Sequence, residues 1–220
     1  MVRPLRNYPA GSCLHIVQRG DNRRTCFHDD QERQRYLELM ECLGKKYRCD
    51  LHAYVLMSNH VHILLTVHAQ NAQSMFMKDL SQQTAHWVHL RHGSTGTMWD
   101  GRYHSSQIDS DAYLLTCQRY IELNPVRAGM VDLPAAYKWS SYRANAEGRE
   151  SSLLTPHPVF LGLGSDGAAR RQAYRALFDV PLEEKDLQRI RFAVQNDFAL
   201  RKTGRPGSDP RVRPAMRARG

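Results

Sequence analysis

Apolar and polar positions along the chain predict strands and helices in turn. Residues 13–18 and 51–57 are short, mostly apolar runs that are typical of β-strands. A third such run begins at His60, directly after the short turn Ser58-Asn59, so we expect a hairpin to join the second and third strands. The polar and aromatic residues 98–108 predict a fourth strand.

Three helices are predicted between and after these strands. The first runs from Asp29 or Asp30 to about Tyr47, because apolar residues recur there every three or four positions. The second spans about 71–91. The third begins near residue 110 and ends near Asn124, since Pro125 disfavours helix at the residue before it. The order β-α-β-β-α-β-α predicts an α+β fold of ferredoxin-like type, an antiparallel sheet flanked by helices.

Composition narrows the class of protein. In 220 residues, 41% are hydrophobic, no run is long enough to cross a membrane, and the first residues do not form a signal peptide. The five cysteines are odd in number and include no C-x-x-C pair, which predicts reduced thiols and a cytoplasmic protein. The net charge of +9 favours a polyanionic partner such as nucleic acid, although a merely basic protein also fits. A DNA partner would make the protein nucleoid-associated.

The charge is concentrated at the C-terminal end. Residues 201–220 hold seven basic residues against Asp209 and almost no apolar side chain, which predicts a disordered basic arm. Within it, Gly204-Arg205-Pro206 resembles the core of an AT-hook. We therefore expect three parts: a body at 1–145, a helical extension at 146–200 with helices near 167–177 and 182–200, and the arm.

Two histidines on the third strand are candidate metal ligands. Successive strand residues alternate faces, so His60 and His62 lie ~7 Å apart on one side of the sheet. Ordinary half-buried histidines with hydrogen bonds are the alternative. Two imidazoles do not complete the shell of a divalent ion, so other ligands must come from elsewhere in the chain.

The third helix offers such a group beside a candidate nucleophile. Tyr120 and Asn124 are four residues apart and lie one above the other, at the edge of the helix's apolar stripe. There a tyrosine hydroxyl can face a substrate, and the Asn124 side-chain oxygen can bind a hard cation. Packing of Tyr120 and capping of the helix end by Asn124 are the alternative roles.

The histidine strand followed by a helical tyrosine and an amide residue resembles the single-tyrosine HUH nucleases, specifically the IS200-like transposases. Further blocks occur in the order found in the branch of REP-associated tyrosine transposases. These blocks are Arg19-Gly20-Asp21-Asn22-Arg23, Trp99-Asp100-Gly101-Arg102-Tyr103, Tyr120-Ile121-Glu122-Leu123-Asn124-Pro125-Val126-Arg127-Ala128-Gly129 and Trp139-Ser140-Ser141-Tyr142-Arg143.

The resemblance implies an enzyme that cleaves and rejoins single-stranded or hairpin DNA next to short palindromic repeats. It implies Tyr120 as the nucleophile, a 5′-phosphotyrosine intermediate, and Mg²⁺ or Mn²⁺ bound by His60, His62 and Asn124. A monomer and a homodimer both occur among such proteins, and we expect no small-molecule cofactor and no membrane contact.

Basic and aromatic residues near these blocks are the candidate DNA contacts. Arg102 and Arg127 are suited to gripping phosphates or stabilising the tyrosinate, and Tyr103 to stacking on a base. The complete set is Arg3, Arg6, Arg19, Arg23, Arg24, Arg102, Tyr103, Arg127 and Arg205.

Two rival functions remain open at this point. One is a metal phosphoesterase. Its His-x-His-x-His type requires a histidine where this chain has Leu64, and its two-motif type requires a second His-x-Ser/Thr strand, to which only His104-Ser105-Ser106 comes close. A non-catalytic DNA-binding protein derived from a transposase is the other alternative.

Overall fold

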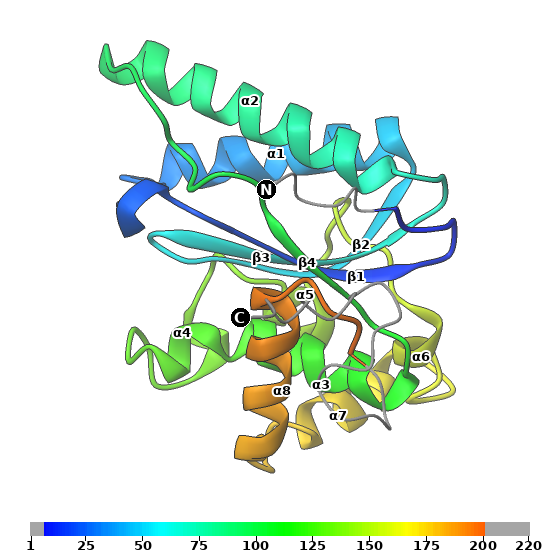
Figure 1. Cartoon of the computed structure of the whole chain (residues 1–220). Coiled ribbons are helices and arrows are strands. Elements are labelled where there is room, and N and C mark those ends of the chain that lie inside the picture. The colour runs from blue at the N-terminus through cyan, green and yellow to red at the C-terminus, as the bar shows by residue number, and fades with distance from the viewer. Residues whose placement is uncertain (1–6, 201–220) are drawn as a thin grey trace, which may run out of the picture.

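The computed structural model describes residues 7–200 and is built on one four-stranded sheet (Figure 1). The strand order is β2-β3-β1-β4, and each neighbouring pair is antiparallel. This confirms the predicted α+β fold, an antiparallel sheet flanked by helices. The strands are β1 (Cys13–Arg19), β2 (Cys49–Leu56), β3 (His60–Val67) and β4 (His104–Gln107).

Two long helices, α1 (Asp30–Tyr47) and α2 (Ala72–His92), cover one face of the sheet. The α1 helix begins where predicted because the Asp29 carboxylate accepts the backbone N–H of Glu32 at 3.0 Å, satisfying a free donor of the first turn. Alternate residues of β1, including Ile16, pack against buried side chains of both helices and form the larger hydrophobic core.

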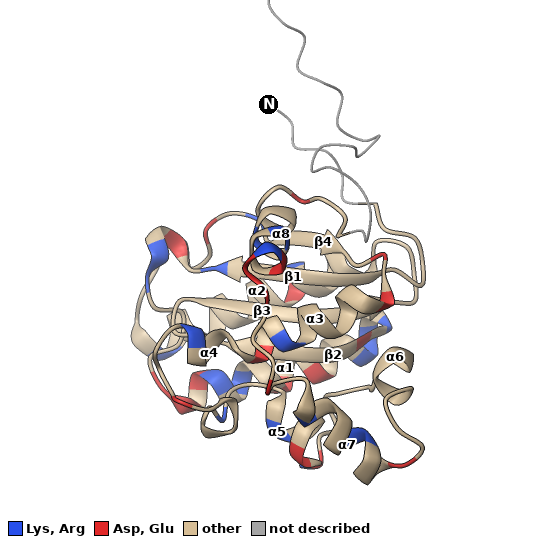
Figure 2. Cartoon of the chain, turned by 90° about the horizontal axis from the view of Figure 1, so that it is seen from below, with Lys and Arg blue, Asp and Glu red and all other residues tan. Residues whose placement is uncertain are grey.

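The opposite face is covered by α3 (Asp111–Glu122) and α8 (Glu184–Gln195). Seen from that side, α8 lies over β4 and β1, and α3 crosses the middle of the sheet (Figure 2). Leu64 of β3 and Ile121 of α3 belong to a second hydrophobic core, to which α8 contributes Leu187 and Ile190. The expected 146–200 segment therefore supplies part of this core.

Short helices complete the described part of the chain. None of its helices is long and apolar enough to span a membrane. All five cysteines are free thiols, and only Cys42 is exposed. The short elements are η1 (Asp21–Arg23), α4 (Asn124–Arg127), η2 (Pro134–Ala136), α5 (Tyr142–Glu147), α6 (Pro158–Leu161) and α7 (Gly167–Ala176).

A buried carboxylate joins α3 to the segments that follow it. Glu122 accepts hydrogen bonds from the Ser141 hydroxyl at 2.6 Å, the Asn145 amide at 2.8 Å and the Tyr174 hydroxyl at 2.7 Å. Burial raises the pKa of Glu122 to about 7, although these three donors oppose the rise. Ser141 directly precedes α5 and Tyr174 lies in α7. The Glu122 carboxyl group therefore connects both of these helices to α3.

The start of the fourth strand differs from the one that the pattern predicts, whereas the end of the third helix falls near Asn124 as expected. The fourth strand is only His104–Gln107, because the residues before it form a turn in which Gly101 has φ +62°. The third helix ends at Glu122, and α4 begins directly at Asn124. Pro125 is tolerated there because it lies in the first turn of the new helix, where no backbone N–H is needed.

Candidate active site

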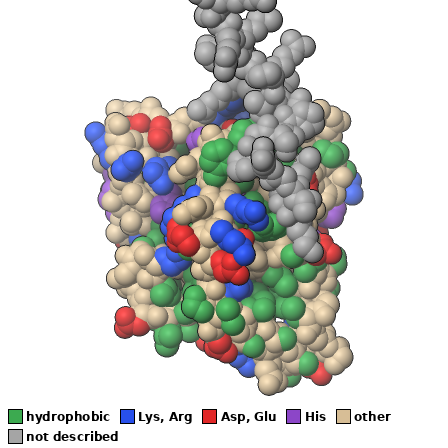
Figure 3. All heavy atoms as spheres, turned by 60° about the horizontal axis from the view of Figure 1, so that its bottom comes forward, with side chains coloured by type: hydrophobic (Ala, Val, Ile, Leu, Met, Phe, Trp, Pro, Cys, Tyr) green, Lys and Arg blue, Asp and Glu red, His purple; other side chains and the backbone are tan. Residues whose placement is uncertain are grey.

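A pocket of about 410 Å³ opens between the sheet and the helices α3, α4 and α8. His60, His62, Tyr120 and Asn124 all line it, so the structure brings the four predicted catalytic and metal-binding residues together. We call it the Tyr120 pocket. Lysine and arginine side chains gather across the upper and central part of the molecular face formed by these helices (Figure 3).

Neighbouring groups fix the proton on the His60 ring. The Asn59 amide nitrogen donates to the Arg23 carbonyl at 3.2 Å, which turns the Asn59 Oδ1 atom toward His60. His60 Nδ1 lies 2.7 Å from that oxygen and must carry the proton that is donated to it. The lone pair of a neutral His60 is therefore on Nε2, which is free to bind a metal.

His62 is held in a similar way, by another histidine. Its Nδ1 atom lies 2.9 Å from Nε2 of His15 on β1, and the two rings stack with centroids 5.1 Å apart. When His62 donates this Nδ1 proton to His15, its own Nε2 presents a lone pair. A buried partner that orients a ligand ring is a common feature of metal sites.

Burial keeps these three rings neutral at physiological pH. It lowers the pKa of His15 to about 3 and that of His62 well below its usual value. Burial, together with the positive charge of Arg19, lowers the pKa of His60 to about 4. Metal binding requires unprotonated imidazoles, so the rings are in the state that a divalent ion needs.

Asn124 presents its oxygen because its nitrogen is already used. The Asn124 Nδ2 atom donates to the Tyr120 carbonyl at 2.9 Å, which leaves Oδ1 as the acceptor end of the side chain. Two imidazole nitrogens and one amide oxygen in the same pocket form a donor set that suits Mn²⁺ or Mg²⁺ completed by water and phosphate oxygens. The residues therefore fit the predicted metal.

Tyr120 lies against the histidines and under a cation. Its ring centroid is 5.7 Å from that of His62 and 5.9 Å from that of His15, and only 6% of its surface is exposed. The guanidinium carbon of Arg127 is 5.2 Å from the ring centroid. A guanidinium at this distance from an aromatic ring makes a cation–π contact, which holds Arg127 beside the nucleophile candidate.

Two of the sequence blocks pair with each other to build the rim of the pocket. The Asp100 N–H donates to the Arg19 carbonyl at 2.8 Å, and the Asp21 N–H donates to the Met98 carbonyl at 3.0 Å. Gly20 is required at the crossing, because a Cβ there would lie 2.4 Å from the Arg24 carbonyl oxygen. The pairing places the exposed Arg19 at the pocket edge.

The predicted DNA contacts divide into four groups. Arg19, Arg102 and Arg127 line the Tyr120 pocket, whereas the exposed Arg23 and Arg24 lie on the adjoining loop. Tyr103 is not brought to the pocket: it belongs to the core beneath α1 and α2, where its hydroxyl lies 3.3 Å from the Ser74 hydroxyl. Three further candidates are outside the described residues, namely Arg3, Arg6 and Arg205.

Sequence reasoning did not identify His15, which lies behind His62, or Arg191, which lines the pocket. His15 shares the sheet face of His62, but this follows only from the antiparallel pairing of β1 with β3, in which Val17 is opposite His62. Arg191 reaches the pocket from α8, far along the chain. The alternation of residues in β1 identifies the sheet face on which His15 lies. That β3, with His62, pairs with β1 is known only from the structure.

The family model of IS200-like transposases matches residues 11–124, just over half of the chain. The chain belongs to the IS200-like transposase family. This confirms the family predicted from the motifs and supports a transposase-type function. The match covers the sheet, α1, α2, α3 and the four residues His60, His62, Tyr120 and Asn124.

One solved structure supports the same fold. A REP-associated tyrosine transposase bound to a REP hairpin superposes with a TM-score of 0.57 at 17% identity, covering 71% of this transposase and 93% of that chain. A protein from Deinococcus radiodurans R1 described as a proposed transposase covers 55% of this chain and 96% of its own, at 19% identity and a TM-score of 0.39, too low to support an argument. No curated protein sequence matches the chain.

Proposed function

We propose that this transposase is a metal-dependent endonuclease and strand transferase that acts on single-stranded DNA beside short REP-type palindromes. The observation that carries the proposal is the Tyr120 pocket, where a tyrosine, two histidines with available Nε2 atoms and an amide oxygen meet inside a rim of arginines. The solved relative bound to a REP hairpin supports hairpin DNA as the partner.

In the proposed reaction the Tyr120 oxygen is the nucleophile. It forms a bond to the scissile phosphorus while the bond from phosphorus to the 3′ oxygen breaks. The phenol proton leaves to solvent, the departing 3′ oxygen gains a proton, and a 5′-phosphotyrosine remains. One phosphodiester replaces another, so a DNA 3′-hydroxyl can reverse the step and rejoin strands without a nucleotide cofactor.

His60, His62 and Asn124 would hold the Mg²⁺ or Mn²⁺ of this site. When bound, such an ion supplies charge neutralisation at the phosphate oxygens of the transition state. The contribution of His15 is to hold the His62 ring by the 2.9 Å contact, and that of Asn59 is to hold the His60 ring. Both ligands then keep a fixed orientation before DNA arrives.

The arginines of the rim would bind the DNA backbone. Arg19, Arg102 and Arg127 are exposed and converge on the pocket that contains Tyr120. Charged hydrogen bonds from guanidinium groups to phosphate oxygens position a strand without reading its sequence. Arg127 also lies over the Tyr120 ring, so a phosphate that it binds would be close to the proposed nucleophile.

Substitution of the tyrosine tests the proposal. A single-stranded hairpin from the protein's own locus, with its flanking bases, is incubated with the enzyme and Mn²⁺. We expect Tyr120→Phe, which removes one hydroxyl, to eliminate a denaturant-resistant protein-DNA adduct while hairpin affinity is preserved. Gel shift under denaturing conditions and peptide mapping of the adduct are the measurements.

Tyr113→Phe is the matched control, because Tyr113 lies on the same helix but is buried in the second core, with its hydroxyl bonded to the exposed Arg189. Tyr103→Phe is a second control in the other core. Both variants should still form the adduct. Phosphate mapped to a residue other than Tyr120 would overturn the mechanism, and hairpin binding without any adduct would favour a non-catalytic DNA-binding protein.

A further inference from the structure

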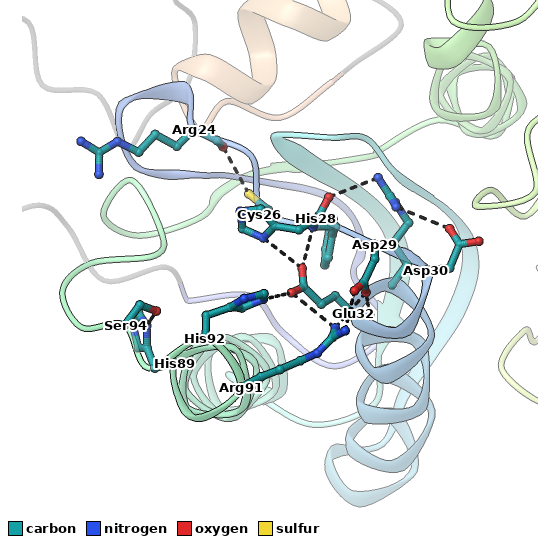
Figure 4. Close-up of polar contacts among 12 residues, drawn as sticks. Arg24, Cys26, His28, Asp29, Asp30, Glu32, His89, Arg91, His92 and Ser94 are labelled. Carbon is teal, nitrogen blue, oxygen red and sulfur yellow. Dashed lines mark hydrogen bonds and ion pairs between the residues drawn. The ribbon is translucent and has the colours of Figure 1, made fainter.

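A second histidine cluster lies on the opposite face of the sheet, where α1 begins and α2 ends (Figure 4). His92 Nε2 lies 2.5 Å from one oxygen of Glu32, and His28 Nδ1 lies 3.3 Å from the other. The two imidazole rings are 5.1 Å apart between centroids. One ligand atom from each of the three side chains falls within 4.8 Å of the others. We call this group the Glu32 cluster.

The carboxylate at its centre is buried. Glu32 is 1% exposed and accepts the His28 backbone N–H at 2.6 Å in addition to the two ring contacts. Burial by itself raises the pKa of Glu32, but the hydrogen bonds from His92 and His28 outweigh it, so the pKa lies below its usual value. A buried carboxylate that stays ionised needs compensating positive charge.

Arg91, the arginine beside the cluster, compensates the negative charge of Glu32 only in part. Arg91 makes two hydrogen bonds to the Asp29 carboxylate, at 2.9 and 2.5 Å, but lies 3.6 Å from Glu32. In this bidentate ion pair, the positive charge of Arg91 mainly compensates the Asp29 carboxylate. With two carboxylates and one guanidinium, the cluster has one negative charge in excess before any proton is added to His28 or His92.

We propose that His28, Glu32 and His92 form a second metal site, of the zinc class. Two imidazole nitrogens and one carboxylate oxygen are the ligands of a four-coordinate Zn²⁺ with one position left for water. Ligand atoms around such an ion are about 3.3 Å apart, so the observed contacts need only small side-chain adjustments. His28 and His92 have side chains that are 56% and 38% exposed, which gives an ion access from solvent.

The ion would fasten three pieces of the chain together. His28 ends the loop that follows β1, Glu32 is in the first turn of α1, and His92 is the last residue of α2. The same loop donates from the Cys26 N–H to the Ser58 carbonyl at 2.7 Å, beside the start of β3. A metal at the Glu32 cluster would therefore stabilise the segment that includes the basic loop.

Another His and Cys group fits a metal less well. Cys13, His52 and His157 also lie within 4.8 Å of one another. Both ring nitrogens of His52 are already used, one at 2.6 Å from the Thr155 carbonyl and one at 2.8 Å from the Thr66 hydroxyl. Burial raises the pKa of the Cys13 thiol to about 12, which opposes the thiolate that a metal requires.

Metal titration of the full chain tests the proposal. The protein is prepared without a histidine tag and with His60→Ala and His62→Ala, so that the Tyr120 pocket does not contribute. We expect one Zn²⁺ per chain by calorimetry, a higher Tm with Zn²⁺, and a visible tetrahedral absorption band with Co²⁺. Each readout is independent of DNA cleavage, so its result does not depend on the proposed function.

Variants locate the ion. His92→Gln and His28→Gln change exposed side chains, so both variants should fold. Each should weaken Zn²⁺ binding by roughly 100-fold, because loss of a residue that only supports a ligand already costs up to about that much. Glu32→Gln should do the same if it folds. His89→Gln is the matched control, one turn before His92 on α2 and bonded instead to Ser94 and Gly96.

Two results would overturn the proposal. One is Zn²⁺ affinity in His92→Gln equal to that of the parent and the His89→Gln control. The other is binding that is lost in His157→Ala but kept in His92→Gln, which would place the ion at the Cys13 group.

Discussion

The Tyr120 pocket and the Glu32 cluster use the same side chain in opposite electrostatic settings. In the pocket, His60 and His62 meet neutral partners, and the surrounding charges are mainly arginines. In the cluster, His28 and His92 meet one buried carboxylate. The neighbours of a histidine, more than the histidine itself, decide whether a site attracts an anion or a cation.

The difference predicts different metal behaviour. The proposed ligands His60, His62 and Asn124 are neutral and lie among guanidinium groups, so they would not offset the two charges of Mg²⁺ or Mn²⁺. We therefore expect the pocket to bind its ion only when the phosphates of DNA complete the site. The Glu32 cluster includes its own negative charge and should bind a metal in the absence of DNA. The predictions below test the two sides of this comparison.

The largest expected effect is the loss of both strand histidines. His60→Ala with His62→Ala should reduce DNA cleavage by roughly 1000-fold or more, because it removes the charge stabilisation that a bound ion gives to the transition state. The Tm should change little relative to this loss. Single-turnover cleavage of the labelled hairpin and thermal unfolding measure the two quantities. Full nicking by the double variant, or in excess EDTA, would refute a metal role in the pocket.

Loss of the buried partner histidine should have a smaller effect. His15→Leu removes the group that holds the His62 ring, and we expect cleavage and Mn²⁺ affinity to fall by roughly 10–100-fold. His15→Gln, whose side-chain oxygen can accept the same proton, should recover part of both. His52→Leu is the control, since His52 is a buried strand histidine that does not line the pocket. Equal losses in His15→Leu and His52→Leu would indicate a merely structural role.

The sequence predicted the sheet, the three main helices and the family because these depend on local periodicity and on contiguous motifs. It did not predict the role of His15, which depends on the pairing of β1 with β3. Tyr103 is an aromatic residue of the kind that stacks on DNA bases. The turn at Gly101 nevertheless directs its side chain into the core beneath α2. The Glu32 cluster was also missed, because His28 and His92 meet only when α1 packs beside α2.

Added DNA should change metal binding at the Tyr120 pocket but not at the Glu32 cluster. In Tyr120→Phe protein, which does not cleave, an added hairpin should tighten Mn²⁺ binding to the pocket by roughly tenfold, within the usual range of coupling between two ligands. Zn²⁺ binding to the Glu32 cluster should not change. Electron paramagnetic resonance follows the free Mn²⁺, and calorimetry follows Zn²⁺. Mn²⁺ affinity that is the same with and without hairpin would mean that the pocket does not need phosphate.

The last prediction concerns acid and the metal-free protein. Burial lowers the pKa of His15 to about 3 and of His60 to about 4, below the value of about 6.5 in an unfolded chain. Between these values the unfolded state binds more protons than the folded one. The stability contributed by the neutral rings is therefore complete above pH 6.5 and is lost as the pH falls toward 4.

Each of the two rings should steepen the fall in unfolding free energy by up to about 1.4 kcal/mol per pH unit. Urea unfolding at pH 7 and pH 5 measures this slope. In His15→Leu the decline should be shallower than in the parent, because one of the buried rings that take up a proton on unfolding is no longer present. A slope in His15→Leu that equals that of the parent would show that the His15 ring is not held neutral by the fold, and the orientation of His62 would then need another explanation.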